Sequence, residues 1–428
     1  MRLLVKNGRV VNPAGQDGAI DILIENDRIV AMEPTITDRI VDVDHVIDAR
    51  GLIITPGLVD VHVHFRDPGQ TYKEDIITGA EAAKHGGYTS VVMMANTVPP
   101  IDNVDTLSYV LKKGKKTGIH VYACANVTKG MQGEELTPME ELVKAGAVGF
   151  TDDGKPILDE CLARQAMIEA KRLNVPISFH EEDPSYILSP GFNKGKAAKS
   201  LGVGGADRLA EIKMVERDTE LALKTGARVI IQHVSAAESV NLIWRAKISG
   251  SDVHAEATPH HFSLTDDDVA KYGTLAKMNP PVRTAKDQFA VIHGLKKGII
   301  DMIATDHAPH SKEEKDEGVL QAPSGIIGLE TAFALAFTKL VCDDHLNIDQ
   351  LIARMSLAPA KVYGLDAGLL EKGGKADIMI FDPYTRWTVP DTFASKSSNS
   401  PFIGWELCGK IKYTICDGKI VYQDDEKT

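Results

Sequence analysis

Residues 56–362 alternate short β-rich runs with longer amphipathic stretches, a pattern typical of a parallel sheet built from βα units. Stretches of helical periodicity, such as 138–145, 160–173 and 216–225, separate the runs. The candidate strands are 58–65, 90–95, 120–125, 148–151, 176–180, 229–233, 253–257 and 302–305. Eight strands in a region of about three hundred residues predict an α/β fold of the (β/α)8 TIM-barrel type. A doubly wound open sheet is the competing fold, but no Gly-x-Gly-x-x-Gly follows the first run.

The two ends of the chain are predicted to be β structure. Residues 1 to about 55 hold short apolar runs separated by turn signals such as Asn-Gly and Pro-Ala-Gly. The C-terminal part has a strand at 376–381 and a hairpin around the Asp-Gly turn within 412–422. Because each end is too small to fold alone, we expect the two to pair. The predicted domains are a composite β-sandwich of residues 1–55 plus 363–428 and a barrel of residues 56–362.

Composition excludes several classes of partner. The chain has 428 residues with 43% hydrophobic and 25% charged side chains, as soluble enzymes do. Its net charge of −12 argues against nucleic acid or an anionic membrane as the main partner. The five cysteines share no short metal-type spacing and suggest a reducing compartment. No signal peptide or apolar run near the ~18 residues of a membrane span is present, so we expect a cytoplasmic protein.

The first predicted barrel strand ends in His62-Val63-His64. Residues two apart in a strand point to one face, so the two imidazoles form a half-site for a divalent metal. One such pair is as readily structural as functional. Arg66 follows the same strand, and similar side chains follow the other strands at the end where barrel enzymes keep their chemistry: Asn96, Asp152, Asp153, His180, Glu181, Glu182, His233, His260, His261, Asp306, His307 and His310. Their joint occurrence predicts a metal site at the barrel mouth.

Four histidines and two aspartates are enough ligands for two divalent metal ions. His62 and His64 can hold one ion, with Asp306 completing its shell, and His180 and His233 can hold the second. Imidazole and carboxylate ligands favour Zn²⁺, with Mn²⁺ or Co²⁺ as alternatives. Two ions that share a water lower its pKa and polarise the carbonyl it attacks. The expected chemistry is therefore hydrolysis.

A carboxylate is needed between the two ions. Asp153 is the candidate because it ends the fourth strand. Asp152 is its rival, with the opposite side-chain direction, and Lys155, just past Gly154, is a weaker alternative bridge. Spacing alone does not decide between them.

These residues are part of longer motifs that resemble the amidohydrolase superfamily of cyclic-amide hydrolases, and within it the dihydroorotases of the long bacterial type. The resemblance covers essentially the whole chain, and its motifs lie at 56–69, 94–100, 150–154, 258–261, 277–283, 306–310, 328–331 and 374–377. The arginine after His-x-His-Phe, the Asn-Thr-x-Pro loop and the Asn-Pro-Pro-x-Arg segment are much narrower signals than His-x-His. By this resemblance Asp153 is the bridging ligand, where many relatives use a carboxylated lysine.

A site for dihydroorotate, a cyclic imide with a carboxylate, needs a cation for that carboxylate. Arg66 lies two residues beyond His64 on the same strand face, and a guanidinium matches a carboxylate bidentately. The resemblance implies further substrate contacts from six positions: His64, Asn96, Asn279, His310, Ser324 and Gly325. The family usually has Phe at position 324 and Glu at position 67, where this chain has Ser324 and Asp67.

The resemblance implies a reaction in which a hydroxide bridging the metals attacks the ring carbonyl and Asp306 carries the proton to the ring nitrogen. The biosynthetic direction closes N-carbamoyl-L-aspartate to (S)-dihydroorotate for pyrimidine synthesis. The alternatives are another cyclic amidohydrolase (allantoinase, hydantoinase or dihydropyrimidinase) and a non-catalytic scaffold for aspartate transcarbamoylase. A homodimer and an association with aspartate transcarbamoylase are family expectations.

Overall fold

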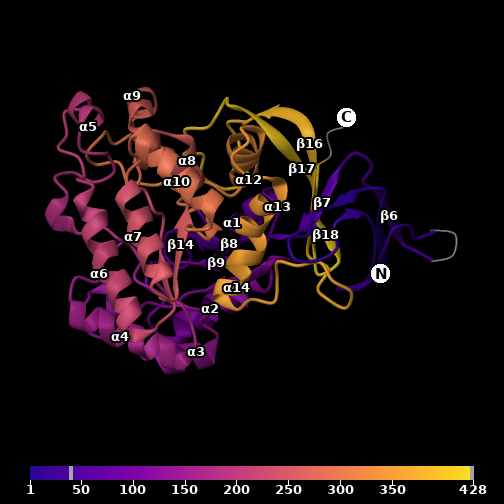
Figure 1. Cartoon of the computed structure of the whole chain (residues 1–428), viewed down its shortest axis with the longest axis horizontal. Helices are drawn as coiled ribbons and strands as arrows, with labels where there is room; N and C mark the ends of the chain where they lie inside the picture. Colours follow the sequence, from indigo (N-terminus) through magenta and orange to yellow (C-terminus); the bar gives the residue numbers. More distant parts are fainter. Residues whose placement is uncertain (38–41, 425–428) are drawn as a thin grey trace.

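The computed structural model describes residues 1–37 and 42–424, and its central feature is a closed parallel sheet (Figure 1). Within those residues, one three-stranded sheet runs in the order β10-β9-β8 and a five-stranded sheet in the order β11-β12-β13-β14-β15. Parallel bridges from Ala125 to Phe150 and from Val63 to His307 join their edges into one barrel. The strands are β8 (Leu58–Val63), β9 (Tyr88–Met93), β10 (His120–Ala123), β11 (Phe150–Thr151), β12 (Ile177–Phe179), β13 (Val229–Ile231), β14 (Val253–Ala257) and β15 (Met302–Ile303).

Helices between the strands cover the barrel from outside (Figure 1). In the one that follows β11, the Asp159 side chain accepts the Leu162 amide at the start, and Asn174 ends the helix in a left-handed conformation. Its alanines and Met167 face the core. The helices are α1 (Ile76–His85), α2 (Val104–Gly114), α3 (Met139–Ala145), α4 (Glu160–Leu173), α5 (Lys196–Ser200), α6 (Leu209–Thr225), α7 (Ala237–Ile248), α8 (Pro259–Ser263), α9 (Val269–Tyr272), α10 (Ala285–Lys297), α11 (Lys312–Lys315), α12 (Ala332–Ala336), α13 (Ile348–Ile352) and α14 (Ala358–Tyr363).

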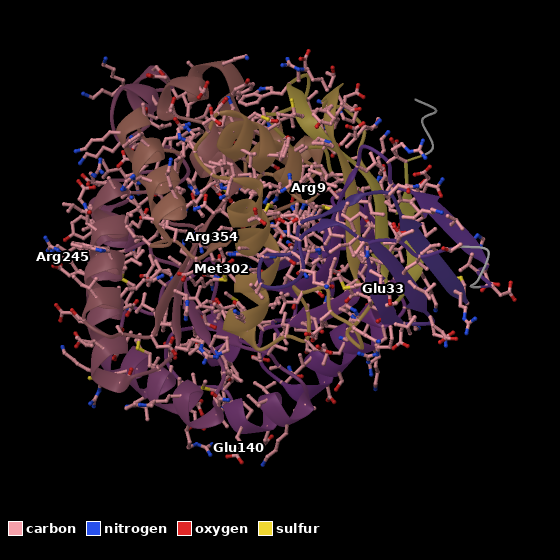
Figure 2. All side chains as sticks on the ribbon, turned by 45° about the vertical axis from the view of Figure 1, so that its right-hand side comes forward. Arg9, Glu33, Glu140, Arg245, Met302 and Arg354 are labelled. Carbon is pink, nitrogen blue, oxygen red and sulfur yellow. The ribbon has the colours of Figure 1, made fainter. Side chains whose placement is uncertain are left out.

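The barrel interior is packed with side chains and is closed at its amino-terminal end. Val61, Met302 and their neighbours fill it together with Val362 and Tyr363 of α14. The Ser356 hydroxyl donates to the Gly57 carbonyl just before β8, which ties the α14 region to that end. In Figure 2, Met302 lies in the interior while Arg245 and Glu140 project from the outer helices. The opposite, carboxyl-terminal end is therefore the one left for chemistry.

Both ends of the chain build one β-sandwich beside the barrel (Figure 1). One sheet has the order β5-β4-β1-β6 and the other the order β18-β17-β16-β7-β2-β3. N-terminal β7 pairs antiparallel with C-terminal β16, which places Ile54 opposite Ile380. The strands are β1 (Arg2–Lys6), β2 (Arg9–Val10), β3 (Gly18–Ala19), β4 (Asp21–Glu25), β5 (Arg28–Glu33), β6 (His45–Asp48), β7 (Ile53–Pro56), β16 (Ile378–Thr388), β17 (Glu406–Cys416) and β18 (Lys419–Gln423).

The predicted barrel with a sandwich made from both termini is confirmed, and some element boundaries differ. The fourth predicted strand, 148–151, shortens to β11, and the eighth, 302–305, to β15. The helix predicted at 216–225 is the second half of α6. The Asp-Gly hairpin is present, with positive φ at Asp417 and Gly418 as a tight turn requires. The proposed division at residues 55/56 and 362/363 stays a prediction.

Two further expectations from the sequence concern the cysteines and membrane-spanning helices. All five cysteines are free thiols. Within residues 1–37 and 42–424, no helix combines the length and the apolar character that crossing a bilayer requires.

Candidate metal centre and substrate pocket

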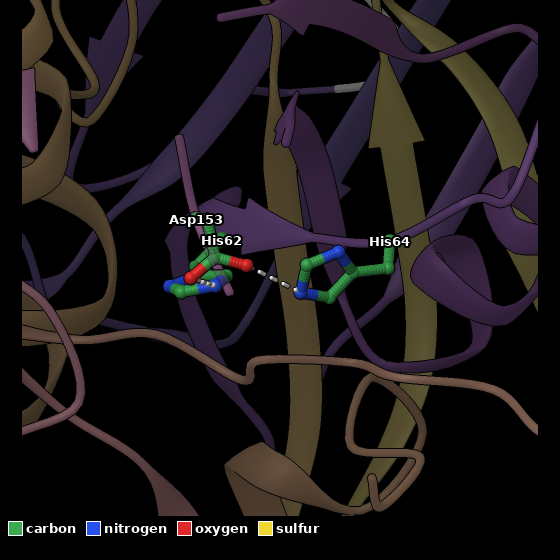
Figure 3. Close-up of side chains that lie close together, drawn as sticks. All are labelled: His62, His64 and Asp153. Carbon is green, nitrogen blue, oxygen red and sulfur yellow. Dashed lines mark ion pairs between the residues drawn. The ribbon is translucent and has the colours of Figure 1, made fainter. Parts of the chain in front are cut away.

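Six predicted ligands from five barrel strands meet at the carboxyl-terminal end of the barrel. All six are buried: His62, His64, Asp153, His180, His233 and Asp306. Strand β8 has an irregularity between Asp60 and Val63, yet the rings of His62 and His64 stay close, with centroids 5.3 Å apart. Figure 3 shows both rings beside the Asp153 carboxylate. The prediction that distant imidazoles and acids converge here agrees with the geometry.

The Asp153 carboxylate lies in the middle of the histidines. Its Oδ1 is 3.5 Å from Nε2 of His62, 3.5 Å from Nδ1 of His180 and 3.6 Å from Nε2 of His233. Its Oδ2 is 3.3 Å from Nε2 of His64. This carboxylate therefore faces both histidine pairs at once.

The two rival bridges face elsewhere. The Asp152 carboxylate accepts the backbone amides of Val127 and Thr128, which holds it against the loop after β10. Lys155 is exposed on the turn that follows Gly154. Of the three candidates, Asp153 alone is directed at the imidazoles.

Asp306 closes the cluster on the His62–His64 side. Its Oδ1 is 3.4 Å from Nε2 of His62 and 3.0 Å from Nε2 of His64. His62, His64 and Asp153, and separately Asp153, His180 and His233, each bring three donor atoms within 4.8 Å of one another. His62, His233 and Asp306 form a third such group.

Partners on the far side of the rings fix which nitrogen faces the centre. Nδ1 of His62 donates to Glu256 at 3.0 Å, and Nδ1 of His64 donates to the Asn96 amide oxygen at 2.9 Å. Nε2 of His180 donates to Glu182 at 3.1 Å. With one nitrogen carrying the hydrogen outward, the other presents its lone pair inward. Metal-ligating histidines have this arrangement.

The charges and unpaired atoms of the cluster fit a divalent cation. Nε2 of His62 and Oδ1 of Asp153 are buried without a hydrogen-bond partner among the described residues. Burial lowers the pKa of His62, but Asp153, Asp306 and Glu256 together raise it well above its usual value. The acids thus attract positive charge to the position that His62 Nε2 faces. Imidazole nitrogens and carboxylate oxygens suit Zn²⁺, Mn²⁺ or Co²⁺.

Three site residues have unusual backbone conformations. Arg66, His233 and Asp306 have φ of 56°, 34° and 48°, in the left-handed region that non-glycine residues rarely adopt. Such a conformation costs on the order of 1–3 kcal/mol and persists only where the surroundings enforce it. Each of the three follows a barrel strand, where the backbone turns its side chain into the mouth.

The histidine–aspartate cluster forms the floor of a small cavity of about 180 Å³. Its walls include most of the predicted site residues: His64, Arg66, Asn96, Asp153, Gly154, His180, His233, Met278, Asn279, Asp306, Ala308, His310 and Ser324. Gly325 is not among them, and its amide donates to the Lys277 carbonyl at 2.9 Å. A substrate contact from Gly325 stays a prediction.

Arg66 and Asn279 lie on the walls of the cavity, and each carries nitrogen atoms that can donate hydrogen bonds. Arg66 Nε donates to the Pro309 carbonyl at 3.3 Å, and its Nη2 is 3.4 Å from Nε2 of His310. Asn279 Oδ1 accepts the Ser324 hydroxyl at 3.0 Å. A guanidinium thus shares a small cavity with the candidate metal centre, which suits a substrate that carries an anionic group.

Other polar residues near the strand ends have structural partners. Asp67 accepts from Tyr109 at 2.9 Å and from Lys113 at 2.6 Å. His261 donates from Nε2 to the Pro280 carbonyl at 2.9 Å, and His307 donates to Glu74 at 3.3 Å. Glu256, by contrast, accepts from Nδ1 of His62, a candidate metal ligand, and was not identified from the sequence. The available signal was an acid inside the buried strand Val253–Ala257.

Sequence comparison gives the family. A model of the amidohydrolase family matches residues 53–421. The dihydroorotase of Clostridioides difficile strain 630 is 55% identical over 98% of this chain and 99% of the relative. The dihydroorotase of Clostridium acetobutylicum is 50% identical over 99% of this chain and 100% of the relative. The chain belongs to the amidohydrolase family and, within it, to the dihydroorotases.

Solved structures that this dihydroorotase-family chain resembles include hydantoinases and dihydropyrimidinases. An L-hydantoinase (dihydropyrimidinase) from Arthrobacter aurescens has a TM-score of 0.88 and 28% identity, covering 100% of this chain and 97% of the other. A dihydropyrimidinase from Brevibacillus agri has a TM-score of 0.87 at 24% identity, covering 100% and 96%. The second likeness supports the barrel-plus-sandwich fold alone.

Proposed function

We propose that this protein catalyses the reversible cyclisation of N-carbamoyl-L-aspartate to (S)-dihydroorotate and water, a step of pyrimidine (UMP) biosynthesis. The observation that carries the proposal is the Arg66 guanidinium in the same cavity as the histidine–aspartate cluster. Dihydroorotate has one carboxylate on its ring, and the open-chain product has two. The chain's dihydroorotase relatives support the same assignment.

In this proposal the cluster holds two divalent ions, most consistently Zn²⁺. His62, His64 and Asp306 would hold one ion, and His180 and His233 the other, with Asp153 shared between them. When bound, such ions lower the pKa of a water and polarise the carbonyl under attack. Every predicted ligand is present, which disfavours a non-catalytic scaffold.

Asp306 is the proposed general acid and base. Its carboxylate lies on the cavity floor, 3.0 Å from Nε2 of His64. In ring opening a C–O bond forms from water and the ring C–N bond breaks. Asp306 accepts the proton that water loses and passes it to the departing ring nitrogen. Ring closure runs the same transfers in reverse.

Arg66 is the proposed clamp for the ring carboxylate, with Asn96 and His310 beside it. Arg66 donates from Nε to the Pro309 carbonyl, so its Nη donors can form a bidentate pair with a carboxylate. Asn279, His64 and the backbone at Ser324 and Gly325 are proposed to contact the ring. Hydantoin and dihydrouracil lack the carboxylate, so an arginine here favours dihydroorotate over the substrates of hydantoinases and dihydropyrimidinases.

The test is ultraviolet measurement of dihydroorotate cleavage by the purified protein, with and without a chelator and with dihydrouracil and hydantoin in parallel. We expect cleavage of dihydroorotate that the chelator abolishes and at least about 100-fold lower kcat/KM for the two uncharged rings, since a charge-assisted pair contributes about 3 kcal/mol. Equal turnover of dihydrouracil would instead assign a dihydropyrimidinase.

Three further proposals need experiments of their own. Size-exclusion chromatography tests the proposed homodimer, a pull-down tests the proposed aspartate transcarbamoylase partner, and cell fractionation tests the proposed cytoplasmic location.

A further inference from the structure

The shortest contact of each ring nitrogen of His310, at the rim of the cavity, is to a different residue, and the Glu314 carboxylate lies 3.5 Å from Nδ1. Nδ1 of His310 is 3.2 Å from Nζ of Lys73, and its Nε2 is 3.0 Å from the Ser324 carbonyl oxygen. The His310 side chain is 8% exposed, so water does not compete freely for either nitrogen. Gly325 permits the approach, because a Cβ there would lie 2.7 Å from the His310 ring.

The chemistry of these partners determines where the ring hydrogen lies. An ammonium can only donate, so Nδ1 of His310 must accept from Lys73. A carbonyl can only accept, so Nε2 must carry the hydrogen and donate to Ser324. The two contacts independently require the same neutral tautomer. An imidazolium would direct a second hydrogen at the Lys73 ammonium.

Arg66 adds a second donor at the same place. Its Nη2 lies 3.4 Å from Nε2 of His310, and both atoms carry hydrogens, so they cannot bond to each other. Two converging donors of this kind match one oxygen of a carboxylate, which would accept from both and replace the Ser324 carbonyl. The tautomer of His310 therefore decides whether it attracts or repels the substrate anion.

Lys73 is fixed in place for this contact. It is 4% exposed, and its Nζ also donates to Glu314 Oε1 at 3.0 Å. Glu314 lies in α11 and accepts the Tyr72 hydroxyl at 2.7 Å and the Ser311 amide at 2.9 Å. The lysine thus links the segment after β8, the short helix α11 and the His310 ring.

We propose that Lys73 is a positioning residue that holds His310 as the neutral Nε2–H tautomer, so that the imidazole donates to the substrate carboxylate alongside Arg66. The proposal rests on the proposed function, because it specifies how the same cavity recognises its anion. Burial, Arg66, Lys73 and Lys315 all lower the pKa of His310, and Glu314 is the acid that faces it. These charges favour the neutral ring but do not determine which nitrogen carries the hydrogen. The Lys73 contact at Nδ1 determines that.

The variants are Lys73→Met, which removes the ammonium and keeps much of the side-chain volume, and Lys73→Arg, which keeps a cationic donor. Lys312→Met is the matched control, because Lys312 is an exposed lysine of α11 that pairs with Asp316. For Lys73→Met we expect KM for dihydroorotate to rise about 10-fold with kcat within about 3-fold of wild type, as for loss of one charge-assisted hydrogen bond. Lys73→Arg should recover most of the loss, and Lys312→Met should match wild type.

The tautomer is read directly from ¹⁵N shifts of the His310 ring in the full-length protein, assigned with a His310→Gln variant. Wild type should show a protonated Nε2 and a bare Nδ1 between about pH 6 and 8. In Lys73→Met the ring should gain the Nδ1–H form or titrate at higher pH. A wild-type imidazolium or Nδ1–H form overturns the proposal even if no Lys73 variant folds, as does an unchanged KM in folded Lys73→Met. If wild type fails to cleave dihydroorotate, the proposed function falls, while the shifts still decide the Lys73–His310 relationship.

Discussion

The carboxylate of Glu256 accepts a hydrogen bond of 3.0 Å from Nδ1 of His62, while Nε2 of the same ring faces Asp153 at 3.5 Å. Glu256 thereby fixes the ring's tautomer and its orientation. Loss of a partner of this kind typically lowers metal affinity by 10- to 100-fold. The arrangement makes Glu256 a positioning residue for His62 in the candidate metal centre.

Replacing Glu256 should therefore weaken metal binding without unfolding the protein. We expect Glu256→Leu to lower Zn²⁺ affinity by about 10- to 100-fold and Glu256→Gln, which keeps an acceptor oxygen, by less. Competition with a chelator of known affinity measures this. Glu220→Leu is the control, because Glu220 is exposed on α6 and pairs with Lys224. Wild-type affinity in Glu256→Leu would show that His62 needs no partner.

Asp306→Asn should separate chemistry from metal binding. An amide cannot carry the proton between water and the ring nitrogen, so kcat should fall by about 10²–10⁴-fold. Metal content, measured by mass spectrometry, should stay close to wild type because the remaining ligands are intact. Asp267→Asn on the exposed surface should leave both values unchanged. Loss of metal with a retained rate would reject the assigned role.

Arg66→Ala should impair recognition of the carboxylate more than of the ring. We expect KM for dihydroorotate to rise about 10- to 100-fold, as for a lost charge-assisted pair. Binding of orotate, which carries the carboxylate, should weaken far more than binding of uracil, which lacks it. Calorimetry on both ligands gives the comparison. An equal loss for the two would mean that Arg66 does not contact the carboxylate.

Glu330 should make stability depend on pH. Burial raises its pKa to about 7, against the Ala394 and Ser395 amides, which favour the ionised form. This folded-state pKa lies above the value of about 4.3 in an unfolded chain. The folded state thus binds the proton more tightly, and stability falls as the pH rises from about 4 to 7.

The Glu330→Gln variant stays neutral and should lack this fall. Its advantage in unfolding free energy over wild type should grow by roughly 2–3 kcal/mol across that range and then level off. Denaturant titrations at several pH values measure it, with the exposed Glu317→Gln as control. Parallel curves for wild type and Glu330→Gln would contradict the prediction.

The Ile380 side chain tests whether the two ends of the chain share one hydrophobic core. It is fully buried on β16 opposite Ile54 of β7, within a core shared by both termini. Ile380→Ala should cost about 2–4 kcal/mol of stability, whereas Ile420→Ala, at a partly exposed position, should cost less than about 1. Thermal unfolding of both variants checks this. Equal Tm values would argue against a common core.

The sequence allowed prediction of which histidines and aspartates converge, because barrel topology places all strand ends at one mouth. His62 and Asp306 are far apart in the chain, yet His62 lies at the end of β8 and Asp306 shortly after β15, so topology brings both to the same mouth. The choice between Asp152 and Asp153 was open because it depends on the turn after β11, which spacing does not determine. Only the structure shows Asp152 accepting the Val127 and Thr128 amides.

Lys73 and Glu256 could not be assigned for a different reason. Their partners lie 237 and 194 residues away, so no local pattern connects them. Lys73 has the sequence context of a solvated loop lysine, but α11 and His310 bury it. Residues that orient other residues depend on tertiary packing, whereas ligands at strand ends depend mainly on topology.

The most direct test of the central claim is a titration of metal-free protein with Zn²⁺ while dihydroorotate cleavage is followed. The account predicts no activity without metal and a rise that saturates at two ions per chain, with the His62→Ala and His180→Ala variants each failing to reach it. Full activity in the metal-free protein, or a rate that ignores added Zn²⁺, would contradict it.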